Sequence, residues 1–227
     1  MNRLATKKTP QKKTRSTKKK ASEESADNAV ENSEEPTNEE LLGSILSLTQ
    51  PDDSPPPNRM ISLFGEIEEE RCGEVAFALR YLAKTTKPDS DPVELIVSTH
   101  GGSASDMFAV YDTIRLVRED VVVATTGIGK VMSAGVLLLA CGTRGHRRIG
   151  ENCRIMLHGV ASGHAGQIFN LENELDEVKW TQDQYVKALA KETDMTPAYI
   201  KKLIGRKVNV YLTAKEAVEL GIADEVF

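Results

Sequence analysis

From residue 59 onward, short apolar runs alternate with segments whose apolar residues recur every three or four positions. The short runs are rich in β-branched and other apolar residues, which favours strands, and they cover residues 60–64, 93–99, 121–126 and 154–157. The longer segments have the spacing of a helix with one buried face. Strands that are regularly separated by helices imply parallel crossover connections, so we expect an α/β layered fold.

The segment beyond Gly166 predicts a long helix with dense charge and a single apolar stripe, which comprises Ile168, Leu171, Leu175, Val178, Tyr185 and Leu189. Such a helix is too long for a small domain to cover, so we expect it to project and to pack against another copy of the chain. An ordinary surface helix is the alternative. Near the end of the chain, Thr213 and Glu216 form a predicted capping box, and Gly221 suits a helix C-terminus.

The first 57 residues differ from the rest in composition. Residues 1–20 contain nine Lys and Arg but no acid, whereas residues 21–40 contain eight Asp and Glu but no base. Neither stretch has enough apolar residues to offset the entropy of ordering, so we expect a disordered charged leader over 1–57. A short amphipathic helix is predicted near 38–48. Residues 58–227 are then the folded domain.

Composition excludes several classes of function. The net charge is −5, and the chain beyond the basic tip is acidic, which argues against a nucleic-acid partner. No stretch has the roughly 18 apolar residues of a membrane span. The three cysteines lack C-x-x-C spacing and the histidines lack metal spacing, so we expect no disulfide framework, no metal and no cofactor. A cytoplasmic location fits the free thiols, with an organelle transit peptide as the alternative for the basic tip.

Two residues carry the candidate chemistry. Ser133 lies between a β-branched strand and an apolar helix that begins at Ala134, and His158 follows the strand at 154–157. A serine beside a base can act as a nucleophile in acyl transfer, provided that N–H donors stabilise the oxyanion. The helix start at Ala134 and the Gly101-Gly102 pair could supply those donors. Taken singly, the serine could be a helix cap and the glycines a turn.

Several motifs are similar to those of the proteolytic subunit of the Clp protease family, and they occur in that family's order. They are Leu63-Phe64-Gly65, the Gly101-Gly102-Ser103 loop, Tyr111-Asp112-Thr113, the nucleophile motif from Gly129 to Gly135, the histidine strand from Asn152 to His158, and the ending from Leu212 to Gly221. The resemblance spans residues 58–227. It implies a ClpP/crotonase-like α/β fold of repeated β-β-α units with a projecting long helix, and a serine endopeptidase.

The resemblance also implies roles for single residues. Ser133 would be the nucleophile and His158 the general base, and the N–H groups of Gly102 and Ala134 would form the oxyanion hole. The position of the family's catalytic aspartate is occupied by Asn209. An asparagine can orient the histidine but brings no negative charge to the imidazolium. Asp194 and Glu216, the candidate substitutes, lie in predicted helices away from that position.

The resemblance further implies heptameric rings of identical subunits, an AAA+ unfoldase ATPase as partner, and protein or peptide substrates. The chain has no phosphate-binding loop, so any use of ATP would belong to the partner. The alternatives are a weakly active or non-catalytic subunit of a mixed Clp ring, and a viral ClpP-like maturation protease. An acyl-CoA enzyme on the related crotonase fold would need catalytic acids after the oxyanion loop, and none is evident.

Overall fold

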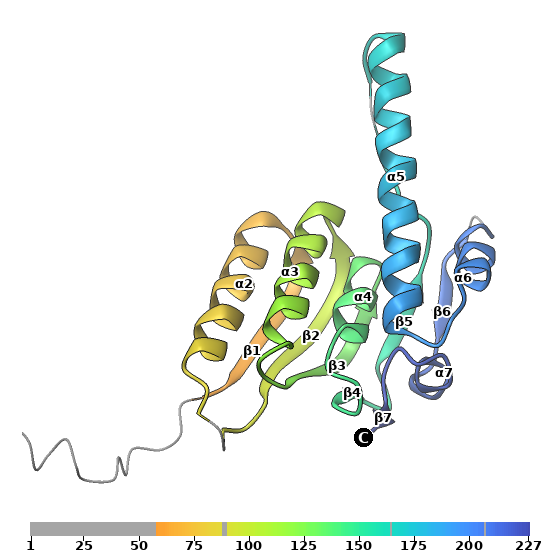
Figure 1. The fold of residues 1–227 in the computed structure, drawn as a ribbon. Helices are drawn as coiled ribbons and strands as arrows, with labels where there is room; N and C mark the ends of the chain where they lie inside the picture. The colour runs from red at the N-terminus through yellow and green to blue at the C-terminus, as the bar shows by residue number, and fades with distance from the viewer. Residues whose placement is uncertain (1–57, 88–89, 164, 207) are drawn as a thin grey trace, which may run out of the picture. The chain divides into compact units, whose positions relative to one another are not determined.

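The computed structural model describes residues 58–87, 90–163, 165–206 and 208–227. The predicted leader, 1–57, and its helix near 38–48 lie outside these residues. The strands are β1 (Met60–Ile67), β2 (Val93–Gly102), β3 (Val123–Met132), β4 (Arg147–Ile149), β5 (Arg154–Leu157), β6 (Val210–Leu212) and β7 (Glu225–Val226). The helices are α2 (Glu69–Lys84), α3 (Ala104–Val117), α4 (Ala134–Ala140), α5 (Ile168–Glu192), α6 (Pro197–Ile204) and α7 (Ala214–Glu219) (Figure 1).

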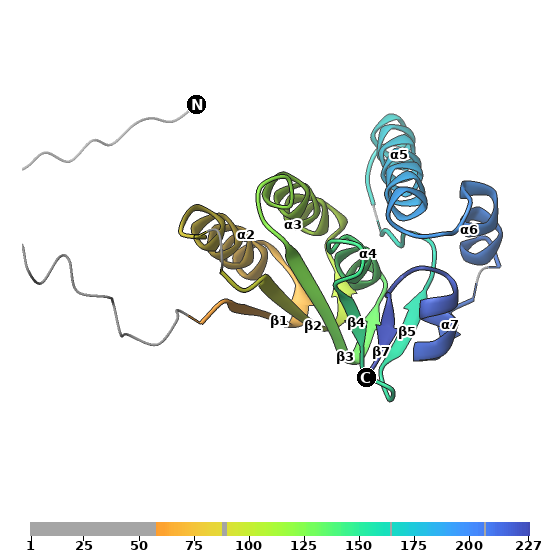
Figure 2. The same cartoon turned by 60° about the horizontal axis from the view of Figure 1, so that its bottom comes forward.

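The strands form one sheet in the order β1-β2-β3-β4-β7, with β5 paired to β3 and β6 paired to β5. All pairings are parallel except that of β5 with β6. Helices α2, α3 and α4 lie side by side on one face of the sheet (Figure 2). Helix α4 is the most buried of the three, since Leu137, Leu138 and Leu139 are all fully inaccessible. The predicted α/β fold with a parallel sheet is confirmed.

Strand β3 changes its pairing partner along its length, and this change determines where the site forms. Its first half pairs with β4 through Thr125–Gly127, whereas its last three residues, 130–132, pair with β5. The backbone N–H of Ser133 continues the second pairing by donating to the Met156 carbonyl at 2.7 Å. The residue that follows β3 is therefore held beside the end of β5.

Helix α5 is anchored at its C-terminal end and exposed at the other. Tyr185, Val186 and Leu189 are buried, whereas Ile168 and Phe169 are 72% and 79% exposed. Figure 1 shows the helix extending well beyond the sheet and the other helices. The prediction of a long projecting helix is thus confirmed. Among the described helices, none is both long enough and apolar enough to cross a membrane.

A buried ionic cluster fixes the anchored end of α5. The Glu192 side chain is 5% exposed and accepts two bonds from the Arg118 guanidinium, at 2.8 and 2.9 Å, and one from the Tyr111 hydroxyl at 3.0 Å. The Arg147 guanidinium donates to the Glu192 carbonyl at 2.7 Å. Because a buried charge is tolerated only when it is fully paired, these bonds hold the helix end in one place.

Several local predictions differ from the structure. The third strand begins at Val123 rather than residue 121 and continues to Met132, so it leads directly into Ser133. Strands β4, β6 and β7 and helix α6 were not predicted from the apolar pattern, because three of them have two or three residues and α6 has only eight. The capping box at Thr213 is present as predicted, and Gly221 follows α7 with a φ of 70°.

Candidate active site

Ser133 occupies a sharp corner between β3 and α4. Its φ of 53° and ψ of −122° make it the one non-glycine residue with positive φ among those the structure describes. Such a conformation costs free energy and persists only where the surroundings impose it. The side chain makes no capping bond to the helix that follows. Ser133 therefore holds the N-cap position of α4 without capping the helix through its side chain, and its hydroxyl is directed elsewhere.

The hydroxyl of Ser133 is hydrogen-bonded to His158, the residue after β5. The distance between Ser133 Oγ and His158 Nε2 is 2.7 Å. The imidazole is half-buried, and the two side chains come from adjacent parallel-paired segments. A neutral imidazole at this distance can accept the hydroxyl proton, which is the requirement for serine nucleophilicity.

The two glycines at the end of β2 allow the backbone to approach this pair closely. A Cβ on Gly101, whose φ is 106°, would lie 2.7 Å from the Cβ of Ser133. A Cβ on Gly102 would clash with the backbone of Ile67 on β1. Both glycines belong to the strand, so the interpretation of the pair as a simple turn is wrong. The glycines are required because no side chain fits between β1, β2 and the serine.

A cavity of about 330 Å³ opens at the serine. It is lined by the four residues Gly102, Ser133, Ala134 and His158, together with His100, Ser103, Ala104, Met107, Gly159, Val160, Ala161 and Tyr185. All of the predicted site residues except Asn209 therefore share one cavity. Ala134 begins α4, so its N–H has no partner four residues earlier within the helix.

The sequence matches the Clp protease family over residues 56–227. The chain belongs to this family. Membership implies a serine peptidase of the ClpP type, a family whose members typically form oligomeric rings that work with AAA+ partners.

Asn209, which the resemblance predicts to replace the catalytic aspartate, lies just before β6. The antiparallel pairing of β5 with β6 ends with Leu157 opposite Val210, and His158 and Asn209 are the residues that adjoin this last pair. Asn209 is exposed, and no hydrogen bond joins it to His158 among the described residues. The structure therefore forms the Ser133–His158 pair but does not join Asn209 to it by a hydrogen bond.

The substitute acids do not reach the histidine. Glu216 accepts bonds from the N–H and hydroxyl of Thr213 in the capping box, at 2.7 and 2.8 Å. Asp194 pairs with Arg144 at 3.1 Å, and it lies in the bend after α5 rather than in a helix, contrary to prediction. Among the described residues, no group of three or more His, Cys, Asp or Glu is placed to hold a metal.

Tyr185 is a site residue that sequence reasoning missed. It was assigned to the apolar stripe of α5, yet its hydroxyl donates to the Ser133 carbonyl at 2.9 Å and its ring lines the cavity. Burial raises the pKa of the phenol well above its ordinary value, which keeps the donor proton in place. The available signal was a tyrosine among aliphatic residues, since a buried phenol needs a partner for its hydroxyl.

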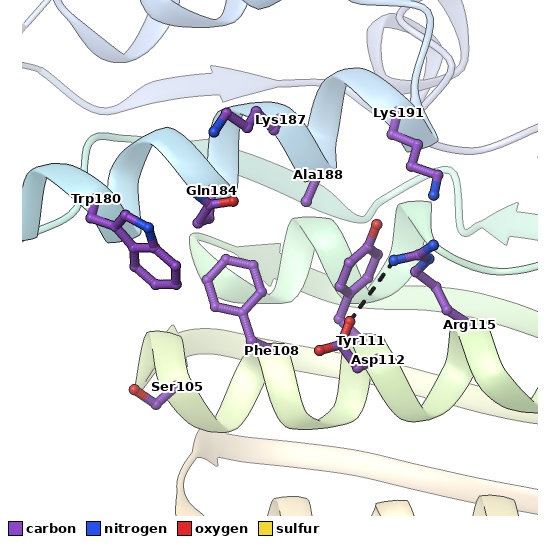
Figure 3. Close-up of a pocket in the computed structure, with 10 residues that line it drawn as sticks. All are labelled: Ser105, Phe108, Tyr111, Asp112, Arg115, Trp180, Gln184, Lys187, Ala188 and Lys191. Carbon is purple, nitrogen blue, oxygen red and sulfur yellow. Dashed lines mark ion pairs between the residues drawn. The ribbon is translucent and has the colours of Figure 1, made fainter. Parts of the chain in front are cut away.

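A second cavity, of about 460 Å³, lies between α3 and α5. Figure 3 shows Trp180 of α5 facing Phe108 of α3, with Asp112 and Arg115 paired at 4.0 Å further along the groove. None of its lining residues is a histidine or a cysteine, and no lining side chain is bonded as Ser133 is to His158. Although this cavity is larger, the residues for acyl transfer are in the smaller one.

Proposed function

We propose that this chain is a serine endopeptidase subunit that hydrolyses peptide bonds through Ser133 and His158. The observation that carries the proposal is the 2.7 Å hydrogen bond between Ser133 Oγ and His158 Nε2. Membership of the Clp protease family supports the reaction class. The strained backbone of Ser133 supports it further, since nucleophilic serines are presented on corners of this kind.

The reaction would proceed by acyl transfer. His158 takes the proton of Ser133 as the oxygen attacks the scissile carbonyl, and the N–H groups of Gly102 and Ala134 donate to the oxyanion. The imidazolium then gives its proton to the leaving amine, which departs as the acyl-enzyme forms. A water molecule, deprotonated by His158, hydrolyses the ester and regenerates Ser133.

The Asn209 position favours a second candidate, a weakly active or non-catalytic subunit of a mixed Clp ring. With no carboxylate bonded to His158 among the described residues, the imidazolium formed in the first step lacks a stabilising charge. In a Ser-His-Asp triad, replacement of aspartate by asparagine lowers kcat roughly 10⁴-fold. Residual catalysis would then depend on the oxyanion donors and on how well the Ser-His pair is held.

We also propose that the subunit assembles into rings of identical copies and receives protein or peptide substrates from an AAA+ unfoldase. The exposed apolar residues at the free end of α5 support assembly, because they would be covered by another copy. Free cysteines at 72, 141 and 153, all buried, are consistent with a cytoplasmic location.

The test is covalent labelling of the assembled wild-type protein with a fluorophosphonate probe, compared with Ser133→Ala. Labelling that is present in the wild type and absent from Ser133→Ala is the expected result. A wild-type protein that stays unlabelled in its assembled form would overturn the peptidase proposal and favour the non-catalytic subunit. Cleavage of an unfolded protein substrate, with and without added ATPase partner, then separates weak from partner-dependent activity.

A further inference from the structure

Two side chains from one face of α5 contact the two segments that carry the reactive pair. Tyr185 donates its hydroxyl proton to the Ser133 carbonyl at 2.9 Å. Gln182, three residues earlier and so on the same side of the helix, accepts from the Val160 N–H at 3.2 Å. Val160 lies two residues after His158. One turn of α5 therefore bridges the serine segment and the histidine segment.

These contacts require a particular local sequence. The side-chain oxygen Oε1 of Gln182 lies 3.0 Å from the position that a Cβ on Gly159 would occupy. The glutamine side chain therefore passes closely over this glycine. Tyr185 is only 5% exposed, so solvent competes little with its bond to the Ser133 carbonyl. Because both partners are backbone groups, these bonds fix the position of the chain beside each reactive side chain.

The helix that carries both residues is well anchored. One and two turns beyond Tyr185, Leu189 is fully buried and Glu192 is held by Arg118 and Tyr111. A rigid helix can therefore transmit its position to the site. A reactive pair without a carboxylate on the histidine depends more heavily on such backbone restraint, because among the described residues the imidazole is hydrogen-bonded to Ser133 alone.

From these contacts we infer that Tyr185 and Gln182 are positioning residues, which hold the Ser133 and His158 segments at hydrogen-bonding distance. The expected slowing of Ser133 labelling rests on the proposed function. The expected effect on the Ser133–His158 distance rests on geometry alone. Neither residue contacts the reacting atoms. Their removal should slow the reaction of Ser133 with a bound probe while leaving probe binding nearly unchanged.

The kinetic test measures the fluorophosphonate labelling rate of the full-length protein against probe concentration, which separates the maximal rate from the binding constant. Tyr185→Phe keeps the ring and removes only the hydroxyl. We expect its maximal labelling rate to fall about tenfold, and that of Gln182→Leu several-fold, with probe binding constants within about twofold of wild type. Maximal rates equal to wild type in both variants would overturn the inference.

Matched controls separate positioning from stability. Thr125→Val also removes a buried hydroxyl that donates to a backbone carbonyl, that of Leu139 at 2.7 Å, but neither residue contacts α5 through this bond. Gln184→Leu makes the same change as Gln182→Leu on α5, where the side chain lines the groove with α3 (Figure 3). We expect both controls to label at the wild-type rate, even where their melting temperatures fall as far as those of the test variants. Slowing in the controls equal to that in the test variants would show a structural role only and would overturn the inference.

A structural readout keeps the inference testable if the peptidase proposal itself fails. If the wild-type protein is not labelled, the positioning role is tested by the distance between Ser133 and His158 in a crystal structure of Tyr185→Phe. A Ser133 Oγ to His158 Nε2 separation beyond hydrogen-bonding range supports the positioning role, whereas an unchanged 2.7 Å contact overturns it. Failure of the function and failure of the positioning role thus give different results.

Discussion

Gly101 lies directly against Ser133, so closely that a Cβ on the glycine would be 2.7 Å from the serine Cβ and 3.1 Å from its Oγ. The glycine also has a φ of 106°, which side chains rarely adopt. Two separate constraints therefore act at one position. One is backbone strain, and the other is contact with the proposed nucleophile.

The variant Gly101→Ala separates these constraints when it is compared with Gly145→Ala. Gly145 has a similar φ of 84°, but a Cβ there would meet nothing within 4 Å. Strain alone costs about 1–2 kcal/mol, so both variants should melt a few degrees below wild type. Only in Gly101→Ala should the rate of fluorophosphonate labelling also fall, by roughly tenfold or more, because the new methyl group displaces Ser133. Equal labelling of the two variants would contradict this reading of the contact.

Asn209→Asp should increase the reactivity of Ser133. Asn209 and His158 both adjoin the last pair of the β5–β6 ladder, Leu157 with Val210, so a carboxylate at position 209 can stabilise the imidazolium that forms during attack. We expect at least a tenfold faster labelling rate, given that the reverse change in a Ser-His-Asp triad costs roughly 10⁴ in kcat. Asn170→Asp, which adds the same charge on the exposed end of α5, is the control. An unchanged rate in Asn209→Asp would mean that this position does not serve the histidine.

The apolar pattern was sufficient to predict the layers of the fold, because the long strands and helices each bury a continuous face. Val93, Leu95 and Val97 are all fully buried on β2, as their alternation predicts. The short strands β6 and β7 depend on pairing with distant partners rather than on their own sequence. Their existence could therefore not be read from the local pattern.

The site was predictable only in part, for a related reason. Ser133 and His158 carry recognisable local motifs, and the structure brings them together. Tyr185 and Gln182 carry no motif, because their importance comes from the path of α5 across two segments that precede it in the chain. The separation of Asn209 from any bond with His158 likewise depends on side-chain placement, which the sequence does not specify.

Stability should depend on pH through the ion pair between Arg147 and Asp224. Arg147 is 1% exposed, and its guanidinium binds both carboxylate oxygens of Asp224, at 3.0 and 2.5 Å. Burial by itself would raise the pKa of Asp224, but the bonds and charge of Arg147 outweigh it, and the pKa lies below its ordinary value of 3.8. A carboxyl group with a lowered pKa stabilises the fold above its unfolded pKa and ceases to do so as the pH falls through its folded pKa.

Asp224→Asn should therefore destabilise the protein at neutral pH by about 3 kcal/mol, since it leaves a buried guanidinium without its counter-charge. We expect a fall in melting temperature of roughly 10 °C at pH 7, and a smaller difference from wild type below about pH 4. Asp194→Asn removes a pair with Arg144 whose side chains are more than half exposed, and it should change the melting temperature very little. A difference that stays constant from pH 7 to pH 3 would contradict the linkage.

The free end of α5 should determine the assembly state of the protein. Leu175 is 55% exposed and lies on the same stripe as Ile168, so both would be covered only by another molecule. A lysine at position 175 would place a charge in that contact. The free-energy cost of burying this charge would apply at each interface between subunits. Leu175→Lys should thus shift the assembled protein to smaller species in sedimentation velocity, whereas Glu177→Lys, on the opposite face of the same helix, should leave the assembly intact. Full-size assemblies in Leu175→Lys would show that another surface holds the copies together.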